Sequence, residues 1–563
     1  MSEQLTIKPN LLDRAVSYIS PVRGMQRMVA KQMMAMGGGG YIGADKSRRS
    51  LMNWLTGGGS ADADTLADLP TLREHSRDLI RNTPMGAGAV GTIVTSVVGS
   101  GLTLQCAIDR DLLTLTDDQA DAWESNTERE FNLWALNCDL RRTLNFYDMQ
   151  ELAFRSMLEN GDVFTVLSYK KRPGDIYGLK LSLVEADRVC NENEAPDSAS
   201  LAGGIQCDGD GAPEFYHILK HHPGNATYQA KEWDKIPAFG EKRGQRNVIH
   251  LYTMLRIDQS RGVPLLAPVI EPLKQISKLT EVELMASVLA SLFTVFIKTE
   301  NGQGLPGFSG PAAPGQPNPN APALAKQAPA KDKQPIAMGS GLIVDLAENE
   351  SVSSETPGRP NGAFEPFFMA IVKEIGIGIE LPVEILMKSF NKSYSASRGA
   401  INEAWRMFLK RRSKLSRGQC DPVYAAFLDE AVASGRIAAP GYFANPLIRQ
   451  AYLGASWNGP GRGQINELVE VKAAELRTEI GMSTLTAEIA AYSGGDGLAI
   501  HRQRVKEVKR RIEGGLVDKK TEKDHLTLNE KRIDDGREPL TGGDAVFMSA
   551  STIPAVEVEE DGA

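Results

Sequence analysis

Cysteine is scarce in this chain of 563 residues, and no two cysteines form a Cys-x-x-Cys pair. Disulfide-rich domains and zinc ribbons need closely spaced cysteines, usually in even number. This chain has five, at Cys106, Cys138, Cys190, Cys207 and Cys420. The pattern argues against a disulfide framework or a zinc site, and it predicts reduced thiols in a cytoplasmic compartment.

Catalytic signatures are also missing. The chain has no Gly-x-x-x-x-Gly-Lys-[Ser/Thr] loop, so it is not a P-loop motor, and it has no Gly-x-Ser-x-Gly elbow. The segment Gly459–Gly463 is glycine-rich, but no strand is predicted before it, and we interpret it as a loop. We therefore expect neither an enzyme nor a bound cofactor.

Positive charge is not in excess. The net charge is −8, and the sequence pI is about 5.6. A static nucleic-acid binder normally carries a basic face, so this balance argues against one. It does not exclude a protein through which DNA merely passes.

A membrane-spanning segment and a secretory signal are not predicted. An uncharged stretch, Met85–Ile108, is long enough to cross a bilayer, but it is rich in Gly and Thr. A helix that begins at Pro84, a turn at Gly99–Gly101 and a strand at Leu102–Ala107 explain it better.

The rest of the chain predicts a mainly helical α+β protein. Helices are expected before residue 160, with Asn145 as the N-cap of the last of them, and strands at Val163–Tyr169, Leu179–Val184, Phe215–Leu219 and Val248–Tyr252. A helix without Gly or Pro follows over Leu273–Lys298, about 39 Å long at 1.5 Å per residue. A strand at Leu342–Leu346 and a helix at Phe364–Ile375, interrupted by Gly376 and Gly378, come next. Three segments are predicted to be flexible or disordered: the arm 1–69, the Pro/Ala/Gly-rich loop 301–338 and the acidic tail 531–563.

Two clusters could carry chemistry. His217, His221 and His222 are either a surface group or part of a metal site, and the lack of well-spaced partner ligands favours the surface. Glu185 and Asp187 are either a carboxylate pair or the shapers of a turn at a strand end, and the turn is favoured.

Two groups of basic residues have two alternative interpretations. Each is either a solvated helix face or a set of contacts with DNA phosphates or a neighbouring subunit. The first group lies along one strong helix and comprises Arg406, Lys410, Arg411, Arg412, Lys414 and Arg417. The second lies near the end of the helical part and comprises Arg502, Arg504, Lys506, Lys509, Arg510 and Arg511.

Five blocks of sequence, in order, resemble the lambda-type phage portal proteins. They are Leu72–Pro84 with Val97–Leu102; Glu159–Phe164 with Glu185–Val189; His250–Tyr252 with Asp258–Pro264 and Ala267–Ile270; Tyr394–Arg398 with Trp405; and Trp457–Gly461 with Lys472–Ala474. The resemblance covers about residues 70–515.

The resemblance implies a ring, expected to be a dodecamer, at one vertex of the virion capsid. DNA would be packaged and ejected through it. The expected partners are double-stranded DNA, the terminase large subunit, head–tail connector or adaptor proteins, and major capsid and scaffold proteins, with assembly in the host cytoplasm and no membrane. A head–tail adaptor or a baseplate protein is the alternative.

The resemblance also implies a division of the subunit. It places the wing at 70–144 and 339–464, stem helices at 145–162 and 256–300, a β-rich clip at 163–255, a channel loop at 381–395 with a long helix 396–416 behind it, and a helical crown at 465–530. Candidate DNA contacts in the channel are Lys388, Lys392 and Arg398, because an acidic wall with a few cations would let DNA slide.

Overall fold

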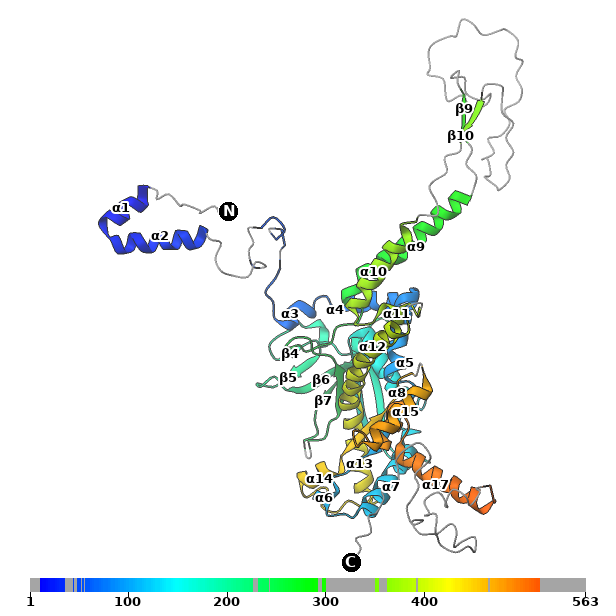
Figure 1. Cartoon of the computed structure of the whole chain (residues 1–563). Coiled ribbons are helices and arrows are strands. Elements are labelled where there is room, and N and C mark those ends of the chain that lie inside the picture. Colours follow the sequence, from blue (N-terminus) through cyan, green and yellow to red (C-terminus); the bar gives the residue numbers. More distant parts are fainter. Residues whose placement is uncertain are drawn as a thin grey trace, which may run out of the picture. The chain divides into compact units, whose positions relative to one another are not determined.

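The computed structural model describes most of the chain (Figure 1). The described residues are 11–35, 44, 48–51, 53–54, 56–225, 231–241, 244–291, 296–299, 350–353, 362–390, 393–463 and 466–516. The chain divides into two units, residues 1–64 and residues 65–563. The first unit contains α1 (Leu11–Ile19) and α2 (Pro21–Ala35), and α3 (Ala61–Thr65) lies at its end. All sites discussed below belong to the second unit.

Two helices open the second unit, α4 (Leu69–Asn82) and α5 (Pro84–Val97). Between them Thr83 acts as an N-cap, because its hydroxyl accepts a hydrogen bond from the Gly86 amide at 3.2 Å. The chain then turns and continues as β1 (Thr103–Cys106), which pairs antiparallel with β11 (Ala455–Asn458). The uncharged stretch thus has the predicted order of helix, turn and strand. None of the described helices is long and apolar enough to cross a membrane.

Helix α8 (Phe146–Asn160) lies at the centre of the main core. Its N-cap is Asn145, as predicted, and Gly161 ends it with a φ of 92°. It packs against α4, α5 and the strands that come after it. Its buried residues are distributed around the helix: Phe146, Met149, Gln150, Ala153, Phe154, Met157, Leu158 and Asn160. The short helix α6 (Arg110–Leu113) and the long helix α7 (Asp117–Ala135) precede it, and α7 adds Phe131 and Trp134 to the same core.

Residues 162–252 form two antiparallel sheets. The first has the order β3-β2-β8, with β2 (Asp162–Tyr169) between β3 (Leu179–Glu185) and β8 (Val248–Tyr252). The second has the order of its chain, β4 (Leu201–Ala202), β5 (Ile205–Cys207), β6 (Pro213–Leu219) and β7 (Trp233–Pro237). Short 3₁₀ turns, η2 (Ala186–Arg188) and η3 (Glu192–Glu194), join them. The four predicted strands are present, whereas β4, β5 and β7 were not predicted.

The first sheet belongs to the main core as much as to a β-rich module. Leu179 and Leu181 of β3, with Ile249 and Leu251 of β8, are buried in the same cluster as α8. A smaller core around Phe164 and Tyr216 connects the two sheets. Region 163–255 is therefore packed on the body of the subunit through its first sheet.

Helices α9 (Ile270–Ser291) and α10 (Phe364–Gly378) lie side by side (Figure 1). The turn η4 (Ala267–Val269) leads into α9. In the first part of α9 Leu273 and Ile276 are buried, whereas further along Val282, Leu284, Met285 and Val288 are exposed. The chain leaves α9 and returns to α10 through the paired strands β9 (Phe296–Thr299) and β10 (Glu350–Ser353).

Two predictions for this region need correction, and two others lie outside the described residues. The helix expected over Leu273–Lys298 ends at Ser291, because the aromatic and β-branched run at Phe296–Thr299 favours a strand. Helix α10 continues through Gly376 and ends at Gly378, since the neighbouring Leu381 backbone caps this end with a bond to the Gly376 carbonyl. The strand predicted at Leu342–Leu346 and the loop 301–338 lie outside the described residues.

The C-terminal half is helical. It contains α11 (Val383–Leu386), α12 (Tyr394–Leu415), the π-helical turn η5 (Ser416–Cys420), α13 (Asp421–Ala433), α14 (Pro446–Tyr452), α15 (Glu467–Glu479), α16 (Leu485–Ser493) and α17 (Gly497–Glu513). The long helix predicted at 396–416 corresponds to α12. Contrary to prediction, the strand β11 does lead into the glycine-rich segment 459–463, but this segment is a loop and does not open a phosphate-binding helix. The tail 531–563 lies outside the described residues.

Candidate functional site

A buried ionic cluster surrounds Asp162, the first residue of β2. Its Oδ1 accepts hydrogen bonds from Arg73 of α4 at 3.0 Å and from Arg261 at 3.2 Å. Its Oδ2 accepts from Arg261 Nε at 2.6 Å and faces His250 Nε2 of β8 at 3.2 Å. The carboxylate is fully buried. Burial alone would raise the pKa of Asp162, but the charges of Arg261 and Arg73 reverse this and hold the pKa far below its usual range.

Arg261 uses its whole guanidinium group within the chain. Besides Asp162, it donates to the carbonyls of Val189 at 2.7 Å, Gly203 at 2.6 Å and Ala186 at 2.8 Å. Its cation also lies 5.0 Å from the ring centre of Phe164. A guanidinium group has five N–H donors in a fixed plane, so this residue can fix several loops at once.

His250 lies between two aromatic rings. Phe164 stacks on it at 4.2 Å and Tyr252 at 4.1 Å, measured between ring centres. Burial lowers the pKa of His250, although Asp162 opposes this shift. The imidazole is therefore neutral at pH 7, and it completes the cluster as a hydrogen-bond partner.

A second, outer set of charges adjoins the cluster. Arg77 forms ion pairs with Asp187 at 2.5 Å and with Glu185 at 3.3 Å, and His222 lies 3.4 Å from Asp187. Asp187 also reaches Arg73 at 3.3 Å. Burial alone would raise the pKa of Asp187, but its bond to Arg77 lowers it. These contacts tie the turn after β3 to helix α4.

The structure revises the prediction for the histidines and confirms the turn at Glu185 and Asp187. His217 is buried and contacts Glu192 at 3.0 Å, so it is not a surface residue, whereas His221 is exposed. His222, Glu185 and Asp187 place ligand atoms within 4.8 Å of one another, a spacing that suits a cation. The Arg77 guanidinium already supplies positive charge there. Glu185 ends β3 and Asp187 lies in η2, as the turn interpretation predicts.

The contacts of the Asp162 cluster connect parts of the fold. Both carboxylate oxygens of Asp162 are engaged by side chains from other elements, namely Arg73, Arg261 and His250. The backbones of Gly161 and Gly262 lie very close together beside it. A Cβ added at Gly161 would lie 2.3 Å from the Gly262 carbonyl oxygen. The cluster therefore holds α4, both sheets and the approach to α9 in one arrangement.

The basic residues of α12 divide into two kinds. Arg412 donates to the carbonyls of Ser96 at 3.0 Å, Val97 at 3.0 Å and Pro460 at 2.8 Å. It therefore caps the C-terminal end of α5 and holds the glycine-rich loop. Burial lowers its pKa to about 10, so it stays charged at pH 7. These three hydrogen bonds are made within the chain.

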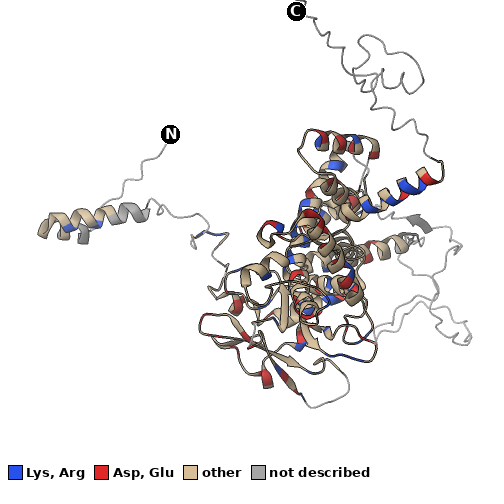
Figure 2. Ribbon diagram, turned by 90° about the horizontal axis from the view of Figure 1, so that it is seen from below, with Lys and Arg blue, Asp and Glu red and all other residues tan. Residues whose placement is uncertain are grey.

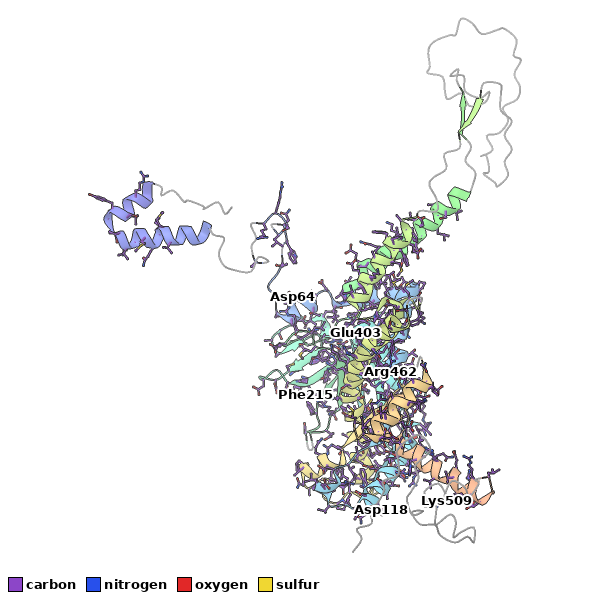
Figure 3. All side chains as sticks on the ribbon, viewed as in Figure 1. Asp64, Asp118, Phe215, Glu403, Arg462 and Lys509 are labelled. Atoms are coloured by element: carbon purple, nitrogen blue, oxygen red, sulfur yellow. The ribbon has the colours of Figure 1, made fainter. Side chains whose placement is uncertain are left out.

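Other residues of this helix remain more accessible. Arg411 is an exception, because only 18% of its side chain is exposed, and it pairs with Glu380 at 3.7 Å. Arg406 has 81% of its side chain exposed and pairs with Glu403, a residue labelled on α12 in Figure 3. Lys410 is exposed. Lys414 near the end of α12 and Arg417 in the following turn η5 are exposed as well.

The structure describes two of the three channel candidates, and their environments differ. Lys388 is exposed just after α11, with a φ of 51°. Arg398 pairs with Glu470 of α15 at 3.6 Å. Arg462, labelled in Figure 3, also binds Glu470, at 2.9 Å, and reaches Asn402 of α12 at 3.0 Å. Lys392 lies outside the described residues.

The second basic group lies on α17 and is exposed along its length (Figure 2). Lys509 is labelled in Figure 3. Large apolar side chains on the same helix are exposed too, namely Ile500, Val505, Val508 and Ile512.

The sequence blocks converge in space. Arg73, Asp162, Asp187, His250 and Arg261 come from the first three blocks and meet around one carboxylate. Arg412 joins three of the blocks. It donates to the carbonyls of Val97 in the first block and Pro460 in the fifth, and its cation lies 5.3 Å from the ring centre of Trp405 in the fourth. Residues far apart in the chain are thus joined at two points.

Comparison with known proteins defines the class. The family model for "Phage portal protein, lambda family" matches residues 47–412, which is more than half of the chain. This chain belongs to the lambda family of phage portal proteins.

The chain is also similar to individual proteins. The chain is 24% identical to the portal protein of Escherichia phage N15 over 493 residues, which cover 85% of this chain and 90% of the relative. It is 23% identical to portal protein B of Escherichia phage lambda over 492 residues, with the same coverage. In the solved virion of a native gene transfer agent particle, one chain is 14% identical, with a TM-score of 0.39, over 75% of this chain and 92% of that chain.

Proposed function

We propose that this protein assembles into a closed ring of identical subunits, expected to be twelve, which forms the channel for viral DNA at one capsid vertex. Membership of the portal family over residues 47–412 carries the proposal. In this proposal the role is structural: the ring is the docking site first for the terminase motor and then for head–tail connector proteins. Capsid and scaffold proteins surround it during assembly.

We also propose a revised position for the stem. A stem helix must protrude from the body, and α8 is buried on several sides in the core. Helices α9 and α10 fit better, since they run side by side and the strands β9 and β10, which lie between them in the sequence, pair with each other. In this assignment the stem is α9 with α10, and the clip comprises the residues between them. Region 163–255 then belongs to the wing.

Exposed apolar side chains on α9 and α10 support a ring. Val282, Leu284, Met285 and Val288 of α9 and Phe367 of α10 are each at least half exposed. Side chains of this kind gain about 25 cal/mol per Å² when a neighbouring surface covers them. Adjacent subunits of a ring would supply that cover.

The channel would be lined by the segment 381–395, with α12 behind it. Twelve copies at −8 each would carry a net charge of −96. A channel wall with this sign of charge would repel DNA, and a few cations such as Lys388 would offset the repulsion locally. Arg406 and Lys410 are further candidates on α12, for DNA or for a neighbouring subunit.

The first experiment is the mass and shape of the purified full-length protein. Native mass spectrometry and negative-stain electron microscopy should show rings with a central hole and a mass near twelve subunits of 61.1 kDa. A monomer or small oligomer across a range of salt concentrations would contradict the proposal.

The channel residues need a separate test. Lys388→Ala with Lys392→Ala should alter DNA packaging or retention while rings still form. Arg398→Ala is made alone, because it also breaks the pair with Glu470. The matched control is Lys170→Ala with Lys171→Ala, two exposed lysines after β2. Normal packaging by the first variant would remove these residues from the channel.

A further inference from the structure

A basic cavity of about 760 Å³ lies between α8, the end of α4 and the first sheet. The cationic side chains that line it are Arg77, Arg81, Arg141, Arg155, Arg188 and Lys220. Neither the Asp162 cluster nor the proposed channel uses this cavity. In a chain whose net charge is −8, this concentration of arginines needs a physical reason.

Four of these arginines have no carboxylate partner within salt-bridge distance in the described part of the chain. Arg77 pairs with Asp187, and Lys220 pairs with Glu232 at 2.8 Å. No such pair is formed by Arg81, Arg141, Arg155 or Arg188. Arg188 uses Nε on the Leu219 carbonyl at 2.8 Å, which leaves its two terminal nitrogens for another acceptor. Burial lowers the pKa of Arg188, and the nearby charge of Arg141 lowers it further.

Three carboxylates, Asp139, Glu159 and Glu185, also line the cavity, so the six cations outnumber them there. Asp139 accepts hydrogen bonds from the amides of Arg141, Thr143 and Leu144, so it is held at the rim by the backbone. Burial raises the pKa of Glu159, and the charges of Arg155 and Arg77 oppose this shift. The arginine side of the cavity therefore attracts an anion.

The wall is also partly apolar. Leu144, Leu152 and Leu183 line it beside the arginines. Phe, Tyr and Trp are missing among the described residues that line it, so bases would have no ring on which to stack. An acidic peptide with apolar side chains fits this surface better than a nucleic acid.

The sequence of this chain contains such a peptide. Residues 556–561 read Val-Glu-Val-Glu-Glu-Asp. In an extended peptide alternate side chains face opposite ways, so the two valines could contact the leucines while Glu557 and Glu559 face arginines. Val558 is 42 residues beyond Leu516 (558 − 516), a reach of up to roughly 140 Å.

We propose that the acidic segment 556–561 docks in the cavity lined by Arg81, Arg141, Arg155 and Arg188. This inference goes beyond the proposed channel and does not depend on it. Carboxylates of the segment bind the unpaired guanidinium groups, and its valines cover the leucines. In a ring, the segment of the same or of an adjacent subunit can reach the site.

Photo-crosslinking of the full-length protein tests the docking. Benzoylphenylalanine at position 558 is irradiated, and crosslinked peptides are identified by mass spectrometry. We expect crosslinks to peptides that contain residues 139–160 or 183–188. Their yield should fall at least fivefold in Arg141→Gln with Arg155→Gln, and equally in Glu557→Gln with Glu559→Gln and Glu560→Gln. The matched control, Arg504→Gln with Lys506→Gln on exposed α17, should leave the yield unchanged.

A salt titration of the otherwise unaltered chain gives a second reading if the arginine variant fails to fold. The crosslink yield should fall as sodium chloride rises from 50 to 500 mM, roughly as expected for exposed charges. Crosslinks that form in isolated monomers support docking of the segment on its own subunit. Crosslinks that form only in rings support docking on an adjacent subunit. Crosslinks outside the cavity, to nucleic acid, or at a yield insensitive to the arginines would overturn it.

Discussion

Asp162 and Arg261 are 99 residues apart in the sequence, and their side chains meet at 2.6 Å in the interior of the protein. The contact joins the first residue of β2 to the loop that leads into α9. Arg73 adds α4 to the same carboxylate. In the proposed ring, this cluster would transmit force between the body of the subunit and the helices α9 and α10.

Asp162→Asn should destabilise the subunit by about 3–5 kcal/mol, because it leaves two buried guanidinium groups without their anion. Urea unfolding followed by circular dichroism measures the change. Asp111→Asn is the matched control, since the side chain of Asp111 is 96% exposed, and it should change stability by less than about 0.5 kcal/mol. Equal effects of the two substitutions would show that the cluster is not a source of stability.

Glu128 on α7 should make stability fall with rising pH. Burial raises its pKa to about 7, even though its carboxylate accepts a hydrogen bond from the Cys106 amide. Since the folded-state pKa lies above the unfolded value of about 4.3, its contribution is complete below that value and is lost as pH rises through 7.

Glu128→Gln keeps the acceptor oxygen and removes the charge. We expect the variant to gain about 1–2 kcal/mol over the unaltered protein at pH 8.5, after allowance for solvent screening, and to differ little at pH 4.5. Urea midpoints at the two pH values measure this. A variant that is less stable at pH 8.5 would refute the assignment.

Two arginines on α12 should differ in how much they contribute to the stability of the fold. Arg412→Ala leaves three carbonyls without their donor, and we expect a loss of about 2–4 kcal/mol. Arg412→Lys should recover only part, because one ammonium group cannot reproduce the fork of a guanidinium. Arg406→Ala, on an exposed part of the same helix, should cost less than about 0.5 kcal/mol but should impair assembly or DNA retention if it lies at an interface. Thermal unfolding and ring mass separate the two roles.

Local signals in the sequence predicted most of the elements. Pro84, Asn145 and Gly161 mark helix ends through chemistry that acts within a few residues, and the structure has each boundary there. Strands β2, β3, β6 and β8 were recognised from their apolar and β-branched residues. The short strands β4, β5 and β7 carry too few such residues to stand out.

The long-range partners could not be predicted. Nothing near Asp162 indicates that its partners are Arg73 and Arg261, because pairing across the fold leaves no periodic pattern. For the same reason Arg412 resembled any exposed cation of a basic helix, although it caps α5. The apolar pattern of α8 did not distinguish a core helix from a stem helix either, since both have buried faces.

Gly161 provides a test of the close backbone crossing beside Asp162. Gly161 has a φ of 92°, and a Cβ there would lie 2.3 Å from the Gly262 carbonyl oxygen. Gly174 has a similar φ of 88°, but a Cβ there would meet nothing within 4 Å. Gly161→Ala and Gly174→Ala therefore share the backbone strain of about 1–2 kcal/mol and differ in the clash.

We expect Gly174→Ala to lower the free energy of unfolding by about 1 kcal/mol, and Gly161→Ala by at least about 3 kcal/mol, since backbone atoms must move apart at the entrance to the ionic cluster. Urea denaturation of both variants measures the difference. If the two substitutions cost the same, the crossing of Gly161 and Gly262 has room to relax. In that case the Asp162 cluster would not depend on close backbone contact to keep its carboxylate dry.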